Sequence, residues 1–370
     1  MKRVLSSVLA LAMMLSLAAC GGNGGNGGNN GGTSNPTPPA ASNNGGSSAT
    51  QQPEAPKTDY PTGPITMIIP YGAGGTSDLA GRQLAIALEK QLGQSIIVSN
   101  QAGASGTVGI QACLDAKPDG YTIVLAAESL GSCRVMGISE MSYDDFSPIS
   151  AISSDPKVLV VASHSKYDTL QTLLDEIKAN PGKVQMSYTG PGGSGHIQAL
   201  IMNRYGYEPA LTAYSSGAEG ITAVLGDQVA FTNSNYSTVV PYLESGDLRL
   251  LAVCATERMD KYPDVPALSE FMEGSDDLLS LPYSPLTLLV NKDVPAEVQE
   301  VLRNATKAAC ADPDFNAWLD ANCIDKLFER YPTVEDTKAF FTEWESVVSW
   351  MLYDAGAAVN SPEDYNIAKP

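Results

Sequence analysis

The sequence is poor in the residues that build metal and redox sites. It contains two histidines and six cysteines among 370 residues, and no two cysteines form a CxxC pair. Five cysteines remain besides Cys20, an odd number that disfavours a metal cluster. Cys310 and Cys323 have a spacing that permits a disulfide around a helical hairpin, and buried free thiols are an equally good interpretation. The sequence therefore predicts neither a metal nor a cofactor.

Basic residues are also scarce. The chain has 22 Lys and Arg against 41 Asp and Glu, a formal net charge of −19 at pH 7. The phosphate backbone of a nucleic acid repels such a chain, so no nucleic-acid partner is expected. An anionic ligand then has to be held by local dipoles and charges, because the overall field of the protein does not attract it.

Long apolar segments are missing after the N-terminus. Lys2 and Arg3 precede an apolar segment at 4–17, which is shorter than the roughly 20 residues that span a bilayer. We therefore expect residues 1–20 to be a signal peptide and not a membrane span. Residues 17–20, Leu-Ala-Ala-Cys, resemble the bacterial lipobox. This resemblance implies that Cys20 carries lipid and anchors the chain to the outer face of the cell membrane, whereas an ordinary signal peptide is the alternative.

Residues 21–59 contain no Leu, Ile, Val or aromatic side chain. Such a segment cannot bury enough apolar surface to fold, so it is predicted to be a disordered tether rich in Gly, Asn and Pro. About 310 residues follow it, which is enough for two lobes.

Short apolar runs alternate with helical patterns from Ile65 onward, and this predicts an α/β fold with mostly parallel sheets. Residues 297–353 are predicted to contain helices only, and Trp318, Trp344 and Trp350 are expected in the core. The expected strands are 65–69, 96–99, 121–126, 158–162, 184–188, 229–232, 248–254 and 286–290. The expected helices include 78–92, 107–116, 168–179, 194–205 and 217–225.

Two segments have the order strand, glycine-rich loop, helix. The first is 64–78, with glycines at 72, 74 and 75, and the second is 184–196, with glycines at 190, 192, 193 and 195. Glycine lets backbone N–H groups approach a ligand, and the start of a helix favours a carboxylate or phosphate. Either loop alone is most simply a structural turn. Two of them predict two similar lobes that face one shared cleft.

These segments resemble the substrate-binding proteins of tripartite tricarboxylate transporters, the Bug receptor family. The resemblance covers residue 60 to the C-terminal helices. Its segments are Tyr60-Pro61, Pro64-Ile65, the loop 70–78, Leu92-Gly93-Gln94, Val98-Ser99-Asn100, Gly103-Ala-Ser-Gly-Thr107, Pro118-Asp-Gly-Tyr-Thr122, the loop 188–196, Tyr214-Ser-Ser-Gly217, Gly226-Asp-Gln-Val229, 248–253 and Tyr262-Pro-Asp-Val-Pro-Ala-Leu268.

The resemblance implies a two-lobed venus-flytrap fold of the type II periplasmic-binding-protein class. Its crossing hinge strands would be 158–162 and 286–290, with one lobe formed by 60–160 plus 286–370 and the other by 161–285. It also implies a monomeric, non-enzymatic receptor that holds a small carboxylate between the two glycine loops and delivers it to membrane permease subunits.

The chain departs from the family pattern in two places. Relatives often carry several prolines in the first loop, whereas 71–75 is Tyr-Gly-Ala-Gly-Gly and should cost more to order. Relatives usually carry acids after the Gly-Gln-Val element, but this chain has Ala230 and then Asn233-Ser-Asn235. We therefore expect a ligand specificity of its own, suited to a polar or anionic distal group.

Individual residues near the loops allow more than one role. Asp78 is expected to stabilise the helix dipole and to pair with Arg82, but would receive an ammonium group if it faces the cleft. His196 either donates to a ligand or shapes its loop, and His164 is expected on the surface or at the hinge. The hydroxyls of the loops are expected to cap the helices and to bond a carboxylate. The predicted ligand-binding residues are Tyr71, Gly74, Gly75, Thr76, Ser77, Asp78, Ser129, Thr189, Gly193, Ser194, His196, Tyr214 and Asn233.

Three other functions are compatible with parts of the sequence. A sensor for a membrane kinase would use the same capture chemistry. A secreted hydrolase is disfavoured because 192–196, Gly-Gly-Ser-Gly-His, lacks the last glycine of G-x-S-x-G. A dinucleotide enzyme is disfavoured because 72–77 ends in serine where G-x-G-x-x-G requires glycine.

Overall fold

The computed structural model describes residues 58–281 and 284–370. The predicted signal peptide, Cys20 and residues 21–57 of the predicted tether lie outside this part of the chain. None of the helices in the described part is long and apolar enough to cross a membrane.

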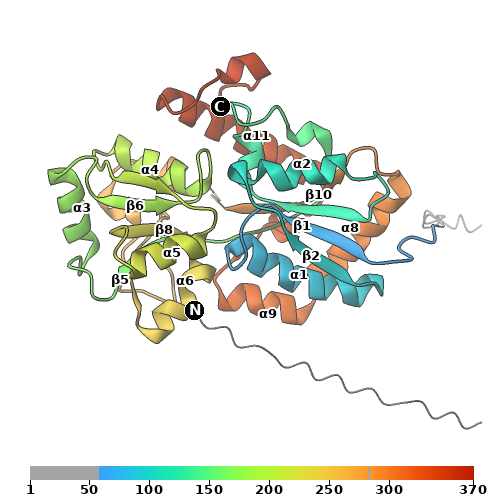
Figure 1. The fold of residues 1–370 in the computed structure, drawn as a ribbon, viewed down its shortest axis with the longest axis horizontal. Helices are drawn as coiled ribbons and strands as arrows, with labels where there is room; N and C mark the ends of the chain where they lie inside the picture. The colour runs from blue at the N-terminus through green and yellow to red at the C-terminus, as the bar shows by residue number, and fades with distance from the viewer. Residues whose placement is uncertain (1–57, 282–283) are drawn as a thin grey trace, which may run out of the picture. The chain divides into compact units, whose positions relative to one another are not determined.

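The first lobe is organised on a six-stranded mixed sheet (Figure 1). Strand β1 lies between β2 and β3 and runs parallel to both. Strand β10 runs antiparallel to β3 and to β4. In spatial order the strands are β11 (Asp325–Lys326), β4 (Phe146–Ser154), β10 (Pro285–Asn291), β3 (Thr122–Ala126), β1 (Ile65–Ile69) and β2 (Ile96–Asn100).

The second lobe is organised on a five-stranded mixed sheet. Strand β6 is parallel to β7 and β8, whereas β5 is antiparallel to β8 and β9. In spatial order the strands are β7 (Ala210–Ala213), β6 (Gln185–Tyr188), β8 (Phe231–Asn235), β5 (Lys157–Ala162) and β9 (Leu248–Val253).

The prediction of mostly parallel sheets was wrong. Of the strand pairings in the described residues, four are parallel and five are antiparallel. The antiparallel pairs involve β5, β10 and β11, and β5 and β10 are the strands by which the chain enters or re-enters a sheet. A chain that crosses between two sheets and returns places such strands against the direction of their neighbours.

The chain passes from the first sheet to the second between β4 and β5, through Asp155 and Pro156 alone. It returns between β9 and β10 by a longer segment that contains the short helix α7 (Asp276–Leu279). The predicted crossing strand 158–162 therefore belongs wholly to the second sheet, and 286–290 to the first. The exact lobe boundaries given above stay a prediction.

Helices cover both sheets (Figure 1). Those that pack with the first sheet are α1 (Thr76–Leu92), α2 (Thr107–Asp115), α8 (Ala296–Cys310) and α10 (Leu327–Arg330), and α9 (Pro313–Ala321) packs against α1 and α8. Those that follow the strands of the second sheet are α3 (Leu170–Ala179), α4 (Ser194–Arg204), α5 (Gly217–Leu225) and α6 (Tyr236–Ser245). The long C-terminal helix is α11 (Val334–Asp354).

Most predicted elements are confirmed within one or two residues, and the misses have identifiable causes. The strand 65–69 has the predicted bounds, but β4 was missed because its sequence is rich in serine and contains Pro148. The strand expected at 229–232 is shifted to β8, and β7 was missed. The prediction of helices only for 297–353 was wrong, because the two residues of β11 pair with β4.

Helix α11 contributes to a core that it shares with the second lobe. Trp344 and Val348 are buried in the same apolar cluster as Leu159 of β5 and Met186 of β6. Trp344 and Trp350 are buried, as predicted, and the partly buried Trp318 packs against the core of the first lobe.

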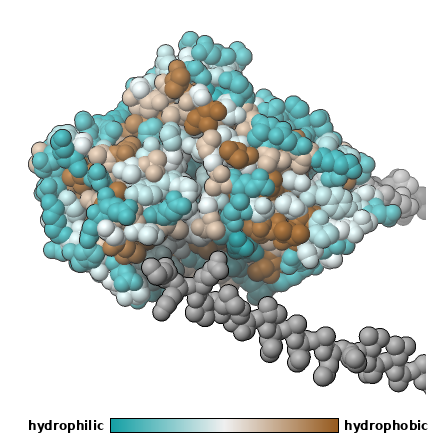
Figure 2. Space-filling model, in the orientation of Figure 1, coloured by the Kyte–Doolittle hydropathy of each residue, from teal (hydrophilic) through white to brown (hydrophobic). Residues whose placement is uncertain are grey.

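The surface offers little continuous apolar area on the face that Figure 2 shows. Brown patches there are small and are separated by hydrophilic residues. The large apolar side chains that are exposed in the described residues are Ile86, Ile97, Val108, Tyr353 and Val359.

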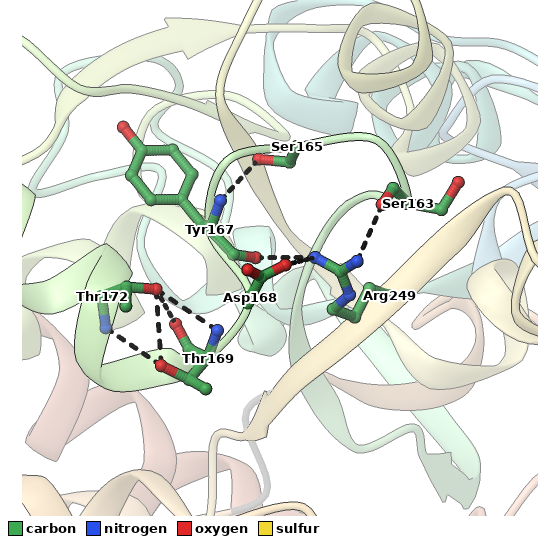
Figure 3. A network of polar contacts seen from close by, with 7 residues as sticks. All are labelled: Ser163, Ser165, Tyr167, Asp168, Thr169, Thr172 and Arg249. Atoms are coloured by element: carbon green, nitrogen blue, oxygen red, sulfur yellow. Dashed lines mark hydrogen bonds and ion pairs between the residues drawn. The ribbon is translucent and has the colours of Figure 1, made fainter.

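The connection after β5 is fastened to β9 by one arginine (Figure 3). Arg249 donates to the carbonyl oxygens of Ser163 at 2.8 Å and Tyr167 at 3.1 Å, and pairs with Asp168 at 2.8 Å. His164 lies exposed in this connection, as predicted, and contacts Asp227 at 3.0 Å. This network ties the segment between β5 and α3 to β9.

The five cysteines in the described part of the chain are free thiols. Cys113, Cys133, Cys254 and Cys310 are buried, and Cys323 is half-buried. Cys310 and Cys323 are therefore not paired in this structure.

Candidate functional site

The two glycine loops have the same backbone geometry where they meet their helices. Gly75 precedes α1 with φ −81° and ψ 169°, and Gly193 precedes α4 with φ −79° and ψ 169°. The residue before each is a glycine with positive φ, 77° at Gly74 and 76° at Gly192. A side chain is strained in that region, so glycine is required at both positions.

Each loop is closed by a side chain four residues further on, in the first turn of the helix. The Gly74 N–H donates to Oδ2 of Asp78 at 2.9 Å, and the Gly192 N–H donates to Nδ1 of His196 at 3.1 Å. Asp78 and His196 therefore occupy equivalent positions. Of the two roles considered for His196, the structure shows the one that shapes the loop.

The two closing side chains differ in charge. Burial raises the pKa of Asp78, but hydrogen bonds from Arg82 and Gly74 outweigh burial and lower it overall. The predicted pair is confirmed, with Arg82 Nη2 2.9 Å from Asp78 Oδ1. Burial lowers the pKa of His196. Because Nδ1 accepts a hydrogen bond, the imidazole is neutral with its proton on Nε2.

The expectation that loop hydroxyls cap the helices was wrong. The residues that cap α1 and α4 are Gly75 and Gly193, which have no side chain to offer. Thr76 and Ser194 instead lie inside the first turns. The Thr76 hydroxyl is engaged elsewhere, because it donates to Oδ2 of Asp155 at 2.9 Å.

A cavity of about 60 Å³ lies between the starts of α1 and α4. It has room for a few water molecules, each of which needs at least about 10–15 Å³ of such volume. It is lined by Tyr71, Gly75, Thr76, Ser77, Ala127, Glu128, Lys157, Thr189, Ser194, Ser216, Gly217, Ser234, Asn235, Thr238, Ser284 and Leu286. Residues from both sheets thus meet in one small polar space.

The predicted site residues divide into those that line this cavity and those that lie around it. Tyr71, Gly75, Thr76, Ser77, Thr189 and Ser194 line it. Gly74 and Gly193 in the loops, and Asp78 and His196 in the first turns of the helices, do not line it. Ser129 receives or donates a hydrogen bond of 2.6 Å with the Tyr71 hydroxyl.

Tyr214 and Asn233 lie away from the cavity. Tyr214 lines a neighbouring groove together with Tyr71 and Thr189. Asn233 is buried in β8, where its Nδ2 donates to Sγ of Cys254 at 3.3 Å. Asn235, two residues further along β8, lines the cavity instead.

The two charged residues that line the cavity were missed. Glu128 lies two residues after the end of the apolar strand β3, in a short 3-10 helix (Glu128–Gly131), and Lys157 begins the apolar strand β5. A charged residue at the end of a fully buried strand is the signal that was available. Such a residue has to meet a partner or a ligand, because an isolated buried charge is costly.

Glu128 connects the first lobe to the start of α4. It is 7% exposed, and its Oε1 accepts a hydrogen bond of 2.7 Å from the Ser194 N–H. A carboxylate of the protein therefore occupies the anion position of the second helix.

Lys157 is the cation of the cavity. It is 5% exposed, and Nζ donates to Oδ1 of Asn235 at 2.7 Å. Burial lowers the pKa of Lys157, and the charge of Glu128 opposes that change.

Asp155 lies at the crossing between the sheets and joins α1 to α6. Besides the Thr76 hydroxyl, it accepts hydrogen bonds from the Ser237 N–H at 3.3 Å and from the Ser237 hydroxyl. Burial raises the pKa of Asp155 to about 6. Asp155 therefore bonds a side chain of α1 but no backbone N–H group at the start of that helix.

The start of α1 is consequently open. Within the described residues, the backbone N–H groups of Thr76 and Ser77 have no hydrogen-bond acceptor, and both residues line the cavity. Free N–H groups at a helix start, with the positive end of its dipole, suit an anion. Lys157 in the same cavity adds a full positive charge.

The cavity has no catalytic arrangement of the kinds considered. Ser194 Oγ has only the hydroxyl of Ser284 as a polar partner, at 3.4 Å, in the part of the chain that the structure describes. Nδ1 of His196 is used by Gly192. No group of three His, Cys, Asp or Glu in the described residues is arranged to hold a metal ion.

Comparison with known proteins matches residues 80–343 to TctC, the tripartite tricarboxylate transporter family receptor. Protein BugT of Bordetella pertussis is 32% identical over 229 residues, which are 60% of this chain and 70% of BugT. A UPF0065 protein from the gbd 5′ region of Cupriavidus necator is 30% identical over 277 residues, which are 73% of this chain and 82% of that protein.

Solved structures share the fold. The periplasmic binding protein BugD superposes with a TM-score of 0.75 at 23% identity, over 81% of this chain and 99% of BugD. MatC of Rhodopseudomonas palustris with bound malate gives 0.69 at 22% identity, over 78% of this chain and 100% of MatC. R. palustris Rpa4515 with adipate gives 0.71 at 23% identity, over 81% of this chain and 99% of that chain.

Proposed function

Because the chain belongs to the tripartite tricarboxylate transporter family of receptors, we propose that it captures a small carboxylate in the cavity between α1 and α4. The proposed receptor then delivers this ligand to the membrane permease subunits of a transporter of the same type. Receptors of this family are extracytoplasmic substrate-binding proteins and not enzymes. The hydrolase and dinucleotide-enzyme alternatives are therefore set aside.

The observation that carries the proposal is the open start of α1 beside a buried lysine. Thr76 and Ser77 present N–H groups without acceptors, and Lys157 supplies a positive charge within the same lining. A carboxylate accepts several such hydrogen bonds at once, and each bond is strengthened by its charge. Two relatives of the same fold are described with dicarboxylates, malate and adipate.

The ligand class is tested by titration of the purified protein with monocarboxylates, dicarboxylates, tricarboxylates, aromatic acids and amino acids. We expect at least one acid to raise the melting temperature and to give a saturable calorimetric signal. A panel of acids that leaves the folded protein unchanged would contradict the proposal.

Attachment to the membrane is proposed at Cys20. Processing at the lipobox-like residues 17–20 would place a lipid on this cysteine and leave the lobes on a tether outside the cell membrane. Substitution Cys20→Ala should abolish incorporation of a fatty-acid label and release the protein from the membrane fraction. Retention of label in the variant would contradict the anchor without affecting the ligand proposal.

The role in transport is separable from capture. A receptor that signals to a membrane kinase would bind the same ligand, so the discriminating measurement is uptake. Deletion of the gene should abolish uptake of the identified acid by cells, with restoration by the wild-type chain. Normal uptake in the deletion strain would contradict delivery to a permease.

A further inference from the structure

The cavity contains one buried cation and one buried anion that do not neutralise each other directly. Lys157 and Glu128 both line it, with 5% and 7% of their surface exposed. No ion pair joins them within the described residues, and each is hydrogen-bonded to a neutral partner. Lys157 donates to the Asn235 side chain, and Glu128 accepts from the Ser194 backbone.

Both charged groups keep unused hydrogen-bonding capacity. An ammonium group has three donors and a carboxylate has about four acceptor positions, whereas one hydrogen bond is present on each group here. A further polar group of the lining is unsatisfied, because Oγ of Ser234 is buried without a hydrogen-bond partner. Buried polar groups in folded proteins are normally satisfied, so these groups point to a ligand that completes them.

The positions of the charges assign an orientation to that ligand. The start of α4 already carries the carboxylate of Glu128, whereas the N–H groups of Thr76 and Ser77 at the start of α1 are free. An incoming carboxylate is therefore attracted to the free N–H groups of α1 and to Lys157 in the same lining, and it is repelled from α4 by Glu128. A positive group on the ligand would face the carboxylate of Glu128.

We propose that the cavity selects a small ligand with both an ammonium and a carboxylate group, held with its carboxylate at α1 and Lys157 and its ammonium at Glu128. The inference rests on the proposed function, because it refines which carboxylates are captured. A simple carboxylate leaves Glu128 buried without a counter-charge, and a dicarboxylate brings a second anion towards it. An amino acid pairs both buried charges at once.

The volume of the cavity favours short ligands. At about 60 Å³ it accommodates only a few atoms beyond a carboxylate unless the lobes separate further. Two matched pairs of probes follow from this size. L-Alanine and propionate share three carbons, L-aspartate and succinate share four, and the members of each pair differ by one ammonium group.

The test is calorimetric titration of the full-length protein with these four probes, in the wild type and in Glu128→Gln. The amide keeps an oxygen that accepts the Ser194 N–H but removes the charge. Glu343→Gln, on the exposed face of α11, is the matched control. We expect the wild type and the control to bind the amino acid of at least one pair 10-fold or more tighter than its acid, and Glu128→Gln to reduce this ratio at least 10-fold.

Three results would overturn the inference. If the wild type binds propionate and succinate as tightly as the matching amino acids, or more tightly, the cavity has no ammonium site. The proposal that it captures a carboxylate is not contradicted by that result. An unchanged ratio in Glu128→Gln removes Glu128 from the mechanism. Binding of none of the four probes also overturns it, and the wider acid panel then decides the proposed function separately. The wild-type ratio remains decisive even if the variant does not fold.

Discussion

The two glycine loops have the same backbone conformation, but the carboxylates at the two helix starts bond differently. Their capping glycines have nearly the same φ and ψ, and each loop is closed by a side chain four residues further on. At α4 the carboxylate of Glu128 takes a backbone N–H, whereas at α1 the carboxylate of Asp155 takes only a hydroxyl. A repeated backbone motif thus forms one occupied and one open anion position.

The difference originates outside the loops. Glu128 follows β3 and Asp155 lies between β4 and β5, so neither belongs to the repeated segment. The same strand–loop–helix unit acquires different chemistry from the carboxylate that the fold places against it. Substitutions of those carboxylates, of Lys157 and of the loop residues should therefore affect the two helix starts differently.

The largest effect is expected from Lys157→Met. This change removes the cation that lines the same cavity as the open helix start, so a bound carboxylate loses its counter-charge. Truncation of one member of a buried charge pair costs about 2–5 kcal/mol, so carboxylate affinity should fall by about 30-fold or more. Calorimetric titration measures the loss, and Lys166→Met, in the exposed connection after β5, is the control. Unchanged affinity in Lys157→Met would remove the cation from the site.

A pH-dependent effect on stability is expected from Asp155→Asn. The Asp155 carboxyl has a pKa of about 6 in the folded protein against an ordinary value of 3.8. The folded state therefore binds this proton more tightly, and the contribution of Asp155 to stability decreases as pH rises from about 4 to about 6. At about 1.36 kcal/mol per pKa unit the decrease is at most about 3 kcal/mol.

The variant lacks this carboxyl, so its stability relative to the wild type should rise across that window and stay constant above it. Urea unfolding at pH 4, 5, 6 and 7 measures the difference. A difference that is the same at every pH would show that the carboxyl does not titrate in this range.

A smaller effect is expected when each capping glycine is changed to alanine, and the loss of unfolding free energy should differ between the two positions. A Cβ at Gly193 would lie 2.8 Å from the Thr189 carbonyl oxygen, whereas one at Gly75 would meet nothing closer than 3.5 Å. Gly193→Ala should therefore destabilise the protein by about 1–3 kcal/mol through overpacking. Gly75→Ala should change stability by less than about 1 kcal/mol, because its φ suits alanine. Equal losses of unfolding free energy would mean that the second loop adapts as easily as the first.

The smallest effect concerns the closing side chains. The folded-state pKa of His196 is depressed below 6.5, so its stabilising contribution is complete above pH 6.5 and is lost as pH falls towards the folded pKa. The pKa of Asp78 is lowered below 3.8, so its contribution persists to more acidic pH. We expect the protection factor of the Gly192 amide to fall at a higher pH than that of the Gly74 amide. Hydrogen exchange followed by NMR compares them, and simultaneous loss would contradict this assignment.

The sequence was sufficient to predict the loops and most of the elements that carry them. Glycine spacing between an apolar run and a helical pattern is a local signal, and it located both helix starts. Lys157 and Glu128 carried a signal, as charged residues at the ends of buried strands, but their hydrogen-bond partners lie 78 and 66 residues away and no local pattern identifies them. Thr76 illustrates the same limit, since its hydroxyl had a plausible local role as a cap but bonds Asp155 instead.

The strand β4 shows why the sheets were harder to predict than the loops. Its serines and Pro148 give it no apolar alternation of its own, and it is a strand because β10 and β11 pair with it. Pairing partners distant in sequence also reversed the expected direction of β5. Local patterns therefore identified the parts of the receptor, but not the order or direction in which the sheets combine them.

The apolar cluster that α11 shares with the second lobe limits how a ligand can leave. Trp344 and Val348 lie in one continuous core with Leu159 and Met186, so wide separation of the lobes would expose these side chains to water. Release by small sliding of packed elements avoids that exposure, in the manner of a shear motion. The position of the C-terminal helix across this core thus gives wide opening a cost in exposed apolar surface that small movements do not carry.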